Sequence, residues 1–103
     1  MTEYCISARI EATGVLPLAE TERLLAGLVR DTAAEPGCLS FEIRRDLENP
    51  SRFALWERWT SPEALQAHFA QAHTRKVLET GATRVLSVQK LAPLGTVPAP
   101  ASE

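Results

Sequence analysis

Residues 38–65, CLSFEIRRDLENPSRFALWERWTSPEAL, contain the pattern that decides the fold. Within this stretch, residues 38–45 and 52–59 alternate apolar and polar side chains with a period of two, which predicts two β-strands. The segment between them, residues 46–51, contains Asp, Asn, Pro and Ser and predicts a hairpin loop. One face of the first strand is then expected to carry Leu39, Phe41 and Ile43, and one face of the second Phe53, Leu55, Glu57 and Trp59.

A helix is predicted directly after the second strand. Thr60 and Glu63 fit a capping box, or Ser61 caps the helix with Pro62 in its first position. Mostly apolar side chains then recur at helical spacing, so one face of this helix must lie against the sheet. That face consists of Leu65, His68, Phe69 and Ala72, and a shorter helical turn is predicted over residues 74–80.

Three further elements surround this block. Residues 3–11 and 84–91 read as strands, and residues 17–35 as an amphipathic helix that Pro36 and Gly37 end. With right-handed crossovers, this order predicts an α+β fold of the ferredoxin-like βαββαβ type. A four-stranded antiparallel sheet, with strand order 4-1-3-2, is then covered by both helices on one face.

The size and charge of the chain argue against several classes of protein. Its 103 residues suit one domain, residues 1–92, followed by a flexible proline-rich tail, residues 93–103. The net charge of −2 and the lack of a basic cluster argue against nucleic-acid binding. No apolar run approaches the roughly 20 residues of a membrane span, and the N-terminus lacks a signal-peptide layout. A cytoplasmic location without membrane contact is therefore expected.

Cys5 and Cys38 are expected to be free thiols. In the predicted strand order a third strand separates the strands that carry them, by about 10 Å in all, whereas a disulfide needs Cα atoms within about 7 Å. Neither a zinc-type Cys/His spacing nor a glycine-rich phosphate loop occurs in the sequence. No metal and no cofactor are predicted.

The sheet face that the helices leave uncovered is expected to bind a second copy of the chain. It should carry Trp56, Leu86 and Val88. These apolar residues are interleaved with Ser7, Arg9, Glu42, Arg44 and Arg58. Because a solvated sheet face does not normally carry a tryptophan and aliphatic residues among its charges, this composition indicates a protein interface. The simplest cover is an identical sheet, which predicts a homodimer.

Residues 35–77 resemble the core of the antibiotic biosynthesis monooxygenase domain family. The resemblance rests on Glu35-Pro36-Gly37-Cys38, on Trp56-Glu57-Arg58-Trp59 with the helix start after it, and on Ala67-His68 with His73 further along. It implies a dimeric α+β barrel. It also implies one of several chemistries, since some members oxygenate quinols or polycyclic aromatic compounds without metal or flavin and others isomerise a small phosphorylated molecule. A distant branch degrades haem, but its strand Asn and helix Trp are missing here.

His68 is the first candidate for a catalytic residue. An imidazole on the sheet-facing side of the helix is shielded from water and titrates near neutrality, as a general base requires. Removing a proton from a phenol or quinol gives an electron-rich anion that can reduce dioxygen directly, without a cofactor. The pocket must also hold the ring and exclude water. Candidate substrate-binding residues are Trp59, Phe41, Phe69 and Tyr4, although tryptophans such as Trp56 and Trp59 are also common core or interface anchors.

Each polar candidate has a structural alternative. His68 can instead bond a backbone carbonyl or Glu57 and hold the helix in place. Glu57 either orients His68, as a second catalytic residue, or forms an ion pair with Arg9 or Arg44. His73 either caps the end of the second helix or lies at the pocket rim as a substrate contact.

The leading hypothesis is a cofactor-independent monooxygenase that uses dioxygen on a quinol, phenolic or polycyclic aromatic substrate. The alternatives are an isomerase of a small polar, phosphorylated metabolite and a non-catalytic dimeric ligand-binding domain. An aromatic-walled cavity with His68 at its end favours oxygenation. Arginines pointing into the cavity favour an anionic metabolite, and a filled cavity favours a structural role.

Overall fold

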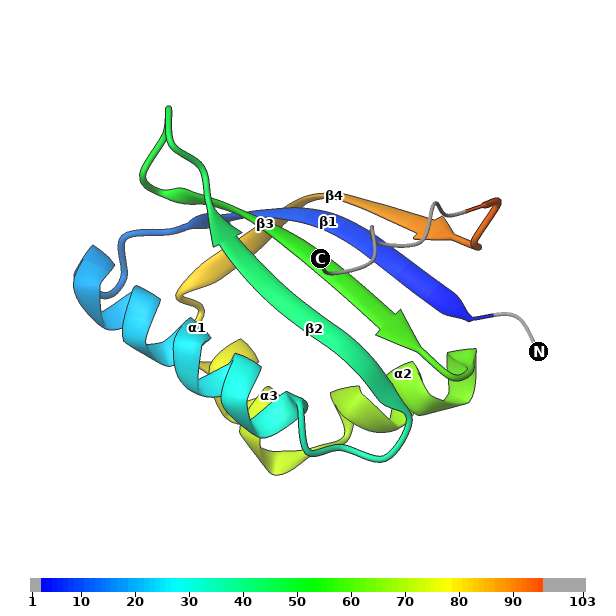
Figure 1. Cartoon of the computed structure of the whole chain (residues 1–103). Coiled ribbons are helices and arrows are strands. Elements are labelled where there is room, and N and C mark those ends of the chain that lie inside the picture. Colours follow the sequence, from blue (N-terminus) through cyan, green and yellow to red (C-terminus); the bar gives the residue numbers. More distant parts are fainter. Residues whose placement is uncertain (1–2, 96–103) are drawn as a thin grey trace, which may run out of the picture.

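Four strands and three helices make up the described part of the chain, residues 3–95 of a computed structural model (Figure 1). In chain order they are β1 (Tyr4–Ala12), α1 (Leu18–Thr32), β2 (Cys38–Arg45), β3 (Arg52–Trp59), α2 (Pro62–Phe69), α3 (Ala72–Glu79) and β4 (Thr83–Leu91). The two strands of the hairpin have the predicted bounds. Most of the predicted tail, from residue 96 onward, lies outside the described residues. None of the described helices is long and apolar enough to cross a membrane.

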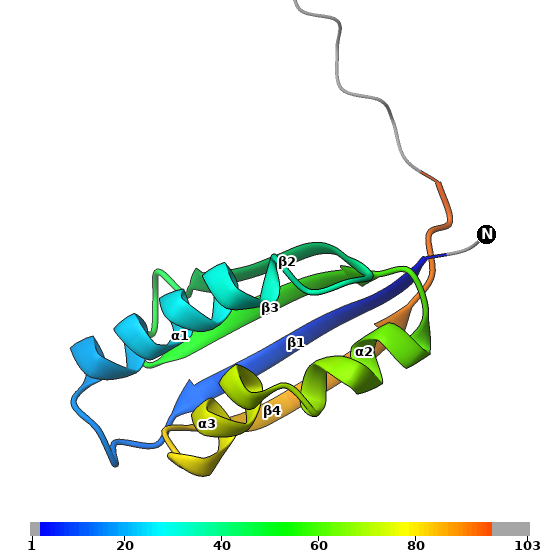
Figure 2. The same cartoon turned by 90° about the horizontal axis from the view of Figure 1, so that it is seen from below.

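The strands form one antiparallel sheet in the order β2-β3-β1-β4. All the helices lie on one face of it: α1 runs beneath β2 and β3, and α2 and α3 run beneath β1 and β4 (Figures 1 and 2). The predicted ferredoxin-like α+β fold and its strand order are confirmed. Cys5 and Cys38 lie on strands separated by β3, and both are free thiols.

The second predicted helix ends earlier than expected, and the helical turn predicted over residues 74–80 is a separate helix, α3. Ser61 caps α2 by accepting a hydrogen bond from the backbone N–H of Ala64 at 3.1 Å. The helix ends at Phe69, and Gln71 has extended backbone angles that start α3. The prediction that Ala72 continues the face of the first helix is therefore wrong. Neither glycine nor proline occurs at the break, so the sequence contains no local signal for it.

A β-bulge changes which residues of β2 face the helices. Cys38 pairs with Trp59 and Ser40 with Arg58, so Leu39 is an extra residue without a partner in the register. Leu39 is 46% exposed. Cys38, rather than Leu39, packs against the core. The predicted inward position of Leu39 is wrong, because the alternation of the strand begins one residue later.

A second irregularity lies between β1 and β4. Arg9 pairs with Ser87 and Ile10 with Val85, which leaves Leu86 without a partner. Beyond the bulge, Val88 pairs with the inward-facing Ala8 and lines the space beneath the sheet. The prediction that Val88 lies on the uncovered face is therefore wrong.

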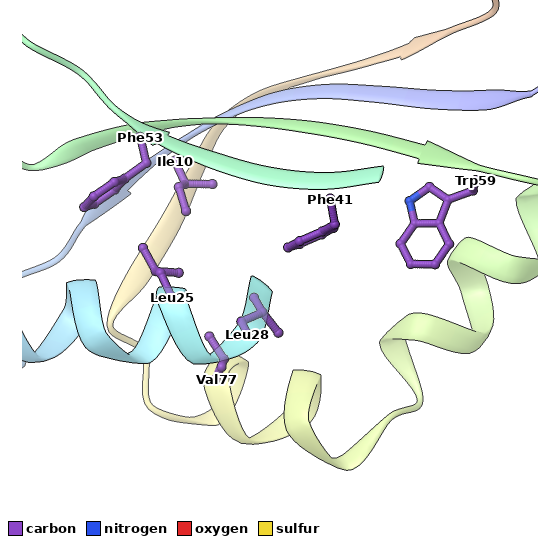
Figure 3. Packing of buried hydrophobic residues seen from close by; sticks show 7 residues of the cluster. All are labelled: Ile10, Leu25, Leu28, Phe41, Phe53, Trp59 and Val77. Atoms are coloured by element: carbon purple, nitrogen blue, oxygen red, sulfur yellow. The ribbon is translucent and has the colours of Figure 1, made fainter. Parts of the chain in front are cut away.

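The core lies between the sheet and α1, with α3 closing its far side (Figure 3). Its buried residues are Ile10, Leu25, Leu28, Phe41, Phe53, Trp59 and Val77. Trp59 has no exposed surface, and its ring meets that of Phe41 edge-on with centroids 6.5 Å apart. Full burial of such a side chain contributes roughly 1.5–3 kcal/mol, so these residues fix the position of the β3 end and of the helix after it.

Gly37 sets the tight entry into β2. Its φ is +84°, and an added Cβ would lie 2.7 Å from the Cβ of Ala64 and 2.9 Å from Oγ1 of Thr60. Gly81 has a similar φ of +67° but nothing within 4 Å of that position. We expect Gly37→Ala to lower the free energy of unfolding by roughly 2–5 kcal/mol, and Gly81→Ala by only roughly 1–2 kcal/mol. Urea denaturation of the two variants checks this; equal losses would show that no clash occurs at Gly37.

Candidate active site

A cavity of about 210 Å³ lies between the inner face of the sheet and the helices. Its walls are mainly aliphatic and aromatic, and the polar side chains that line it are Glu57, His68, Thr74, Thr83 and Lys90. An apolar cavity of about 150 Å³ is enough to bind benzene. The space beneath the sheet therefore fits one six-membered ring with its substituents. It is open rather than filled with side chains.

The cavity opens to solvent beside β4. Four apolar residues line it although about half or more of the surface of each is exposed: Phe69 (53%), Leu78 (57%), Val85 (64%) and Val88 (52%). They come from α2, α3 and β4, which border the same side of the molecule in Figure 2. An apolar molecule can enter between these residues with little loss of polar solvation.

His68 is held at the inner wall of the cavity by aromatic rings. It is 3% exposed, and its ring centroid lies 5.1 Å from that of Trp59 and 5.4 Å from those of Phe41 and Phe69. Ser61 fixes where α2 begins and thus which turn carries His68 inward. The inward orientation of His68 agrees with the sequence-based prediction.

A carboxylate that the sequence analysis did not single out binds this imidazole. Oε2 of the buried Glu35 lies 2.8 Å from Nδ1 of His68 and 2.5 Å from Nε2 of His73. A carboxylate accepts, so each of these ring nitrogens donates to it. With its proton on Nδ1, neutral His68 has its lone pair on Nε2, the nitrogen left for a molecule in the cavity.

Glu35 comes from the turn between α1 and β2, just before Pro36 and Gly37. In the sequence it precedes a helix-ending motif and belongs to a stretch that carries the family resemblance, but neither feature marks it as a partner of His68. No spacing rule links it to a histidine 33 residues away. The contact depends on how the turn after α1 meets α2 in the folded chain, which explains why pattern reasoning missed it.

Glu57 is buried in the cavity wall on β3. Its Oε1 accepts a hydrogen bond from the indole N–H of Trp59 at 3.0 Å. Burial raises the pKa of the Glu57 carboxyl; the Trp59 hydrogen bond opposes that rise, and the negative charge of Glu35 adds to it. The alternative of an ion pair with Arg9 or Arg44 is wrong, because the register pairs both arginines with Ala54 on the opposite face.

The other proposed substrate contacts divide into two groups. Phe41 and Phe69 line the cavity. Trp59 lies behind His68, and Tyr4 packs at the edge of the core, so neither is part of the cavity wall. His73 lies in the first turn of α3 and binds Glu35, so its alternative role as a cap at the end of a helix is wrong.

Comparison with known proteins agrees with this architecture. Residues 18–80 match the model of a family described as antibiotic biosynthesis monooxygenase. The chain belongs to the antibiotic biosynthesis monooxygenase family. It is 29% identical over 82 residues to the uncharacterized protein YjcS of Bacillus subtilis strain 168, a match that covers 80% of this chain and 78% of YjcS.

Solved structures of other proteins share the fold of this antibiotic biosynthesis monooxygenase domain. The structure of YjcS superimposes with a TM-score of 0.81 at 27% identity, covering 86% of this chain and 96% of YjcS. SnoaB of Streptomyces nogalater, described as a cofactor-independent oxygenase, gives the same TM-score at 18% identity, with 96% and 100% of the two chains covered. At that identity the likeness to SnoaB shows the fold alone.

The raised pKa of Glu57 predicts a pH-dependent effect of Glu57→Gln on stability. Because the folded chain holds this proton more tightly than the unfolded chain does, the carboxyl costs stability once the pH rises through its folded-state pKa. Gln keeps the acceptor for Trp59 and removes the charge. At about pH 8 the variant should be more stable than the wild type by on the order of 1 kcal/mol, and at about pH 4 the two should be nearly equal.

Urea denaturation at both pH values measures this difference. Glu48→Gln, on the exposed hairpin loop, is the matched control and should change stability little at either pH. If Glu57→Gln is less stable than the wild type by the same amount at both pH values, the carboxylate of Glu57 is not a buried, destabilising charge.

Proposed function

We propose that the protein is a monooxygenase that oxidises a single-ring quinol or phenol with dioxygen and without an organic cofactor. The family membership supports an oxygenase. The observation that carries the proposal is the acceptor nitrogen of His68 at the wall of an apolar cavity with room for one ring. Nε2 of His68 takes the hydroxyl proton, and the anion that forms transfers electrons to dioxygen in the same cavity.

The reaction balances without a further reductant. Dioxygen supplies two oxygen atoms. One enters the ring of the quinol and the other leaves as water. The quinol provides all the electrons for this and becomes a hydroxyquinone. His68 holds the first proton, and Glu57, whose pKa is raised by burial, is placed to give a proton to the reduced oxygen. The apolar walls keep bulk water from the anion.

The cavity lining argues against the isomerase alternative. A phosphorylated metabolite needs several cationic or N–H donors around its phosphate. Among the described residues that line the cavity, Lys90 is the only lysine or arginine. Arg44 and Arg58 lie on the opposite face of the sheet, where they pair with Glu42 and Glu3. An apolar, uncharged ring suits the cavity better than an anion does.

Dioxygen consumption with a panel of substituted hydroquinones and phenols tests this function. The wild type should consume dioxygen faster than the spontaneous rate with at least one of them. His68→Gln, which cannot accept a proton, should lose roughly 10²–10⁴-fold in kcat. Gln66→Ala, on the exposed side of the same helix, is the matched control and should keep full activity.

Two outcomes would contradict the proposal in different ways. If no compound in the panel is consumed above the spontaneous rate, the reaction class is wrong. If His68→Gln retains the wild-type rate while its near-ultraviolet circular dichroism is unchanged, the oxygenase stands but its base lies elsewhere.

We further propose that the protein works as a homodimer through the uncovered sheet face. Trp56 is 39% exposed there, and Leu91, opposite Cys5 in the register, is 40% exposed. Leu86 at the β4 bulge lies beside Arg9 and is 43% exposed. Apolar side chains spread among ion pairs are typical of an interface between subunits.

Light scattering after gel filtration measures the assembly. The wild type should have twice the chain mass of 11.3 kDa. Trp56→Glu should shift it to the monomer mass, because it places a charge in the interface. Leu47→Glu changes a leucine that is 96% exposed at the hairpin tip, and it should leave the dimer intact. A wild-type monomer, or a dimer that survives Trp56→Glu, would refute this interface.

A further inference from the structure

We propose that Glu35, His68 and His73 form a binding site for one divalent transition-metal ion. A carboxylate oxygen and two imidazole nitrogens, Nδ1 of His68 and Nε2 of His73, lie within 4.8 Å of one another. They converge from the turn after α1, from α2 and from α3. An ion about 2.0–2.2 Å from each atom needs donors roughly 3.0–3.5 Å apart. The Glu35 oxygen, now 2.8 and 2.5 Å from the two nitrogens, therefore has to move away from them by less than about 1 Å to admit the ion.

The charge of Glu35 favours a cation at this position. The Glu35 side chain is 5% exposed. Among the described residues, only the imidazoles of His68 and His73 lie within ion-pair distance of it. The carboxylates of Glu3 and Glu11, by contrast, pair with arginines near the surface. A buried carboxylate needs a compensating positive charge. A divalent ion supplies that charge and uses the same three atoms.

The donor set indicates the class of ion. Two imidazole nitrogens and one carboxylate oxygen suit zinc and the late divalent transition metals, and do not suit calcium or magnesium, which prefer oxygen ligands. Three protein ligands leave a position open for water. The His73 side chain is 23% exposed, so an ion can reach the cluster from solvent without passing through the apolar cavity.

Metal binding would change the chemistry of His68, a consequence that rests on the proposed function. An ion takes the lone pair of Nδ1, so the proton that Nδ1 now donates to Glu35 moves to Nε2. Nε2 then presents an N–H to the cavity and cannot accept a proton from a substrate. The metal-bound form should therefore be inactive as an oxygenase, with its activity restored by a chelator.

Binding can be measured without any substrate. The chain has two histidines, both in the proposed site, so protein freed of any purification tag has no other imidazole. Zn²⁺ titration by calorimetry should show one ion per chain. Long-range ¹H–¹⁵N spectra of the two imidazole rings should show both shifting together, and Co²⁺ should give the visible absorption of a coordinated ion.

Variants identify the ligands. Glu35→Gln and His73→Ala should each weaken Zn²⁺ binding at least about tenfold. The exposed Glu48→Gln should bind as the wild type does. Because His73 is only partly buried, His73→Ala should fold and can test the metal site even if Glu35→Gln does not fold.

Each outcome bears on the site separately from the oxygenase. Absence of Zn²⁺ binding, or binding that Glu35→Gln and His73→Ala leave unchanged, would overturn the site whatever the activity assays show. Binding with the expected loss in both variants supports it even if no quinol is oxidised. If the enzyme is active and bound Zn²⁺ does not inhibit it, the proposed coupling to His68 is wrong.

Discussion

The hydrogen bond from Nδ1 of His68 to Glu35 is the interaction on which the site depends. It determines which ring nitrogen carries the proton, and so which one meets the cavity as an acceptor. The rings of Phe41, Trp59 and Phe69 surround the imidazole, and Oγ1 of Thr74 lies 3.3 Å from the same ring nitrogen. Because Glu35 lies in the turn just before β2 and His68 lies on α2, the relative position of sheet and helices also sets the geometry of the proposed base.

The carboxylates on the two faces of the sheet have different partners. On the uncovered face, carboxylates such as Glu3 and Glu42 pair with arginines where water screens the charges. On the inner face, Glu35 and Glu57 are buried without an arginine or lysine among their described contacts. Buried carboxyl groups without a lysine or arginine partner cost stability, and such costs are more typical of functional sites than of packing.

The sequence predicted the fold well because alternation and capping are local signals. The strands of the hairpin, the Ser61 cap and the inward position of His68 each follow from a few neighbouring residues. The errors share one physical cause. The extra residues Leu39 and Leu86, the break after Phe69 and the contact of Glu35 all depend on tertiary packing. Period counting cannot detect a bulge, because a bulge shifts the period without changing the composition.

The β4 bulge, which sequence periodicity missed, is also what shapes the entrance to the cavity. An unbroken alternation from Val85 would turn Val88 to the uncovered face and leave a polar residue in its place. With Leu86 as the extra residue, both valines face inward and meet Phe69 across the opening. The entrance is therefore apolar on both sides, so a charged molecule must lose its hydration before it reaches His68. For the proposed substrate, selection for a neutral ring would begin at the sheet edge, where one additional residue in a strand decides which side chains line the opening.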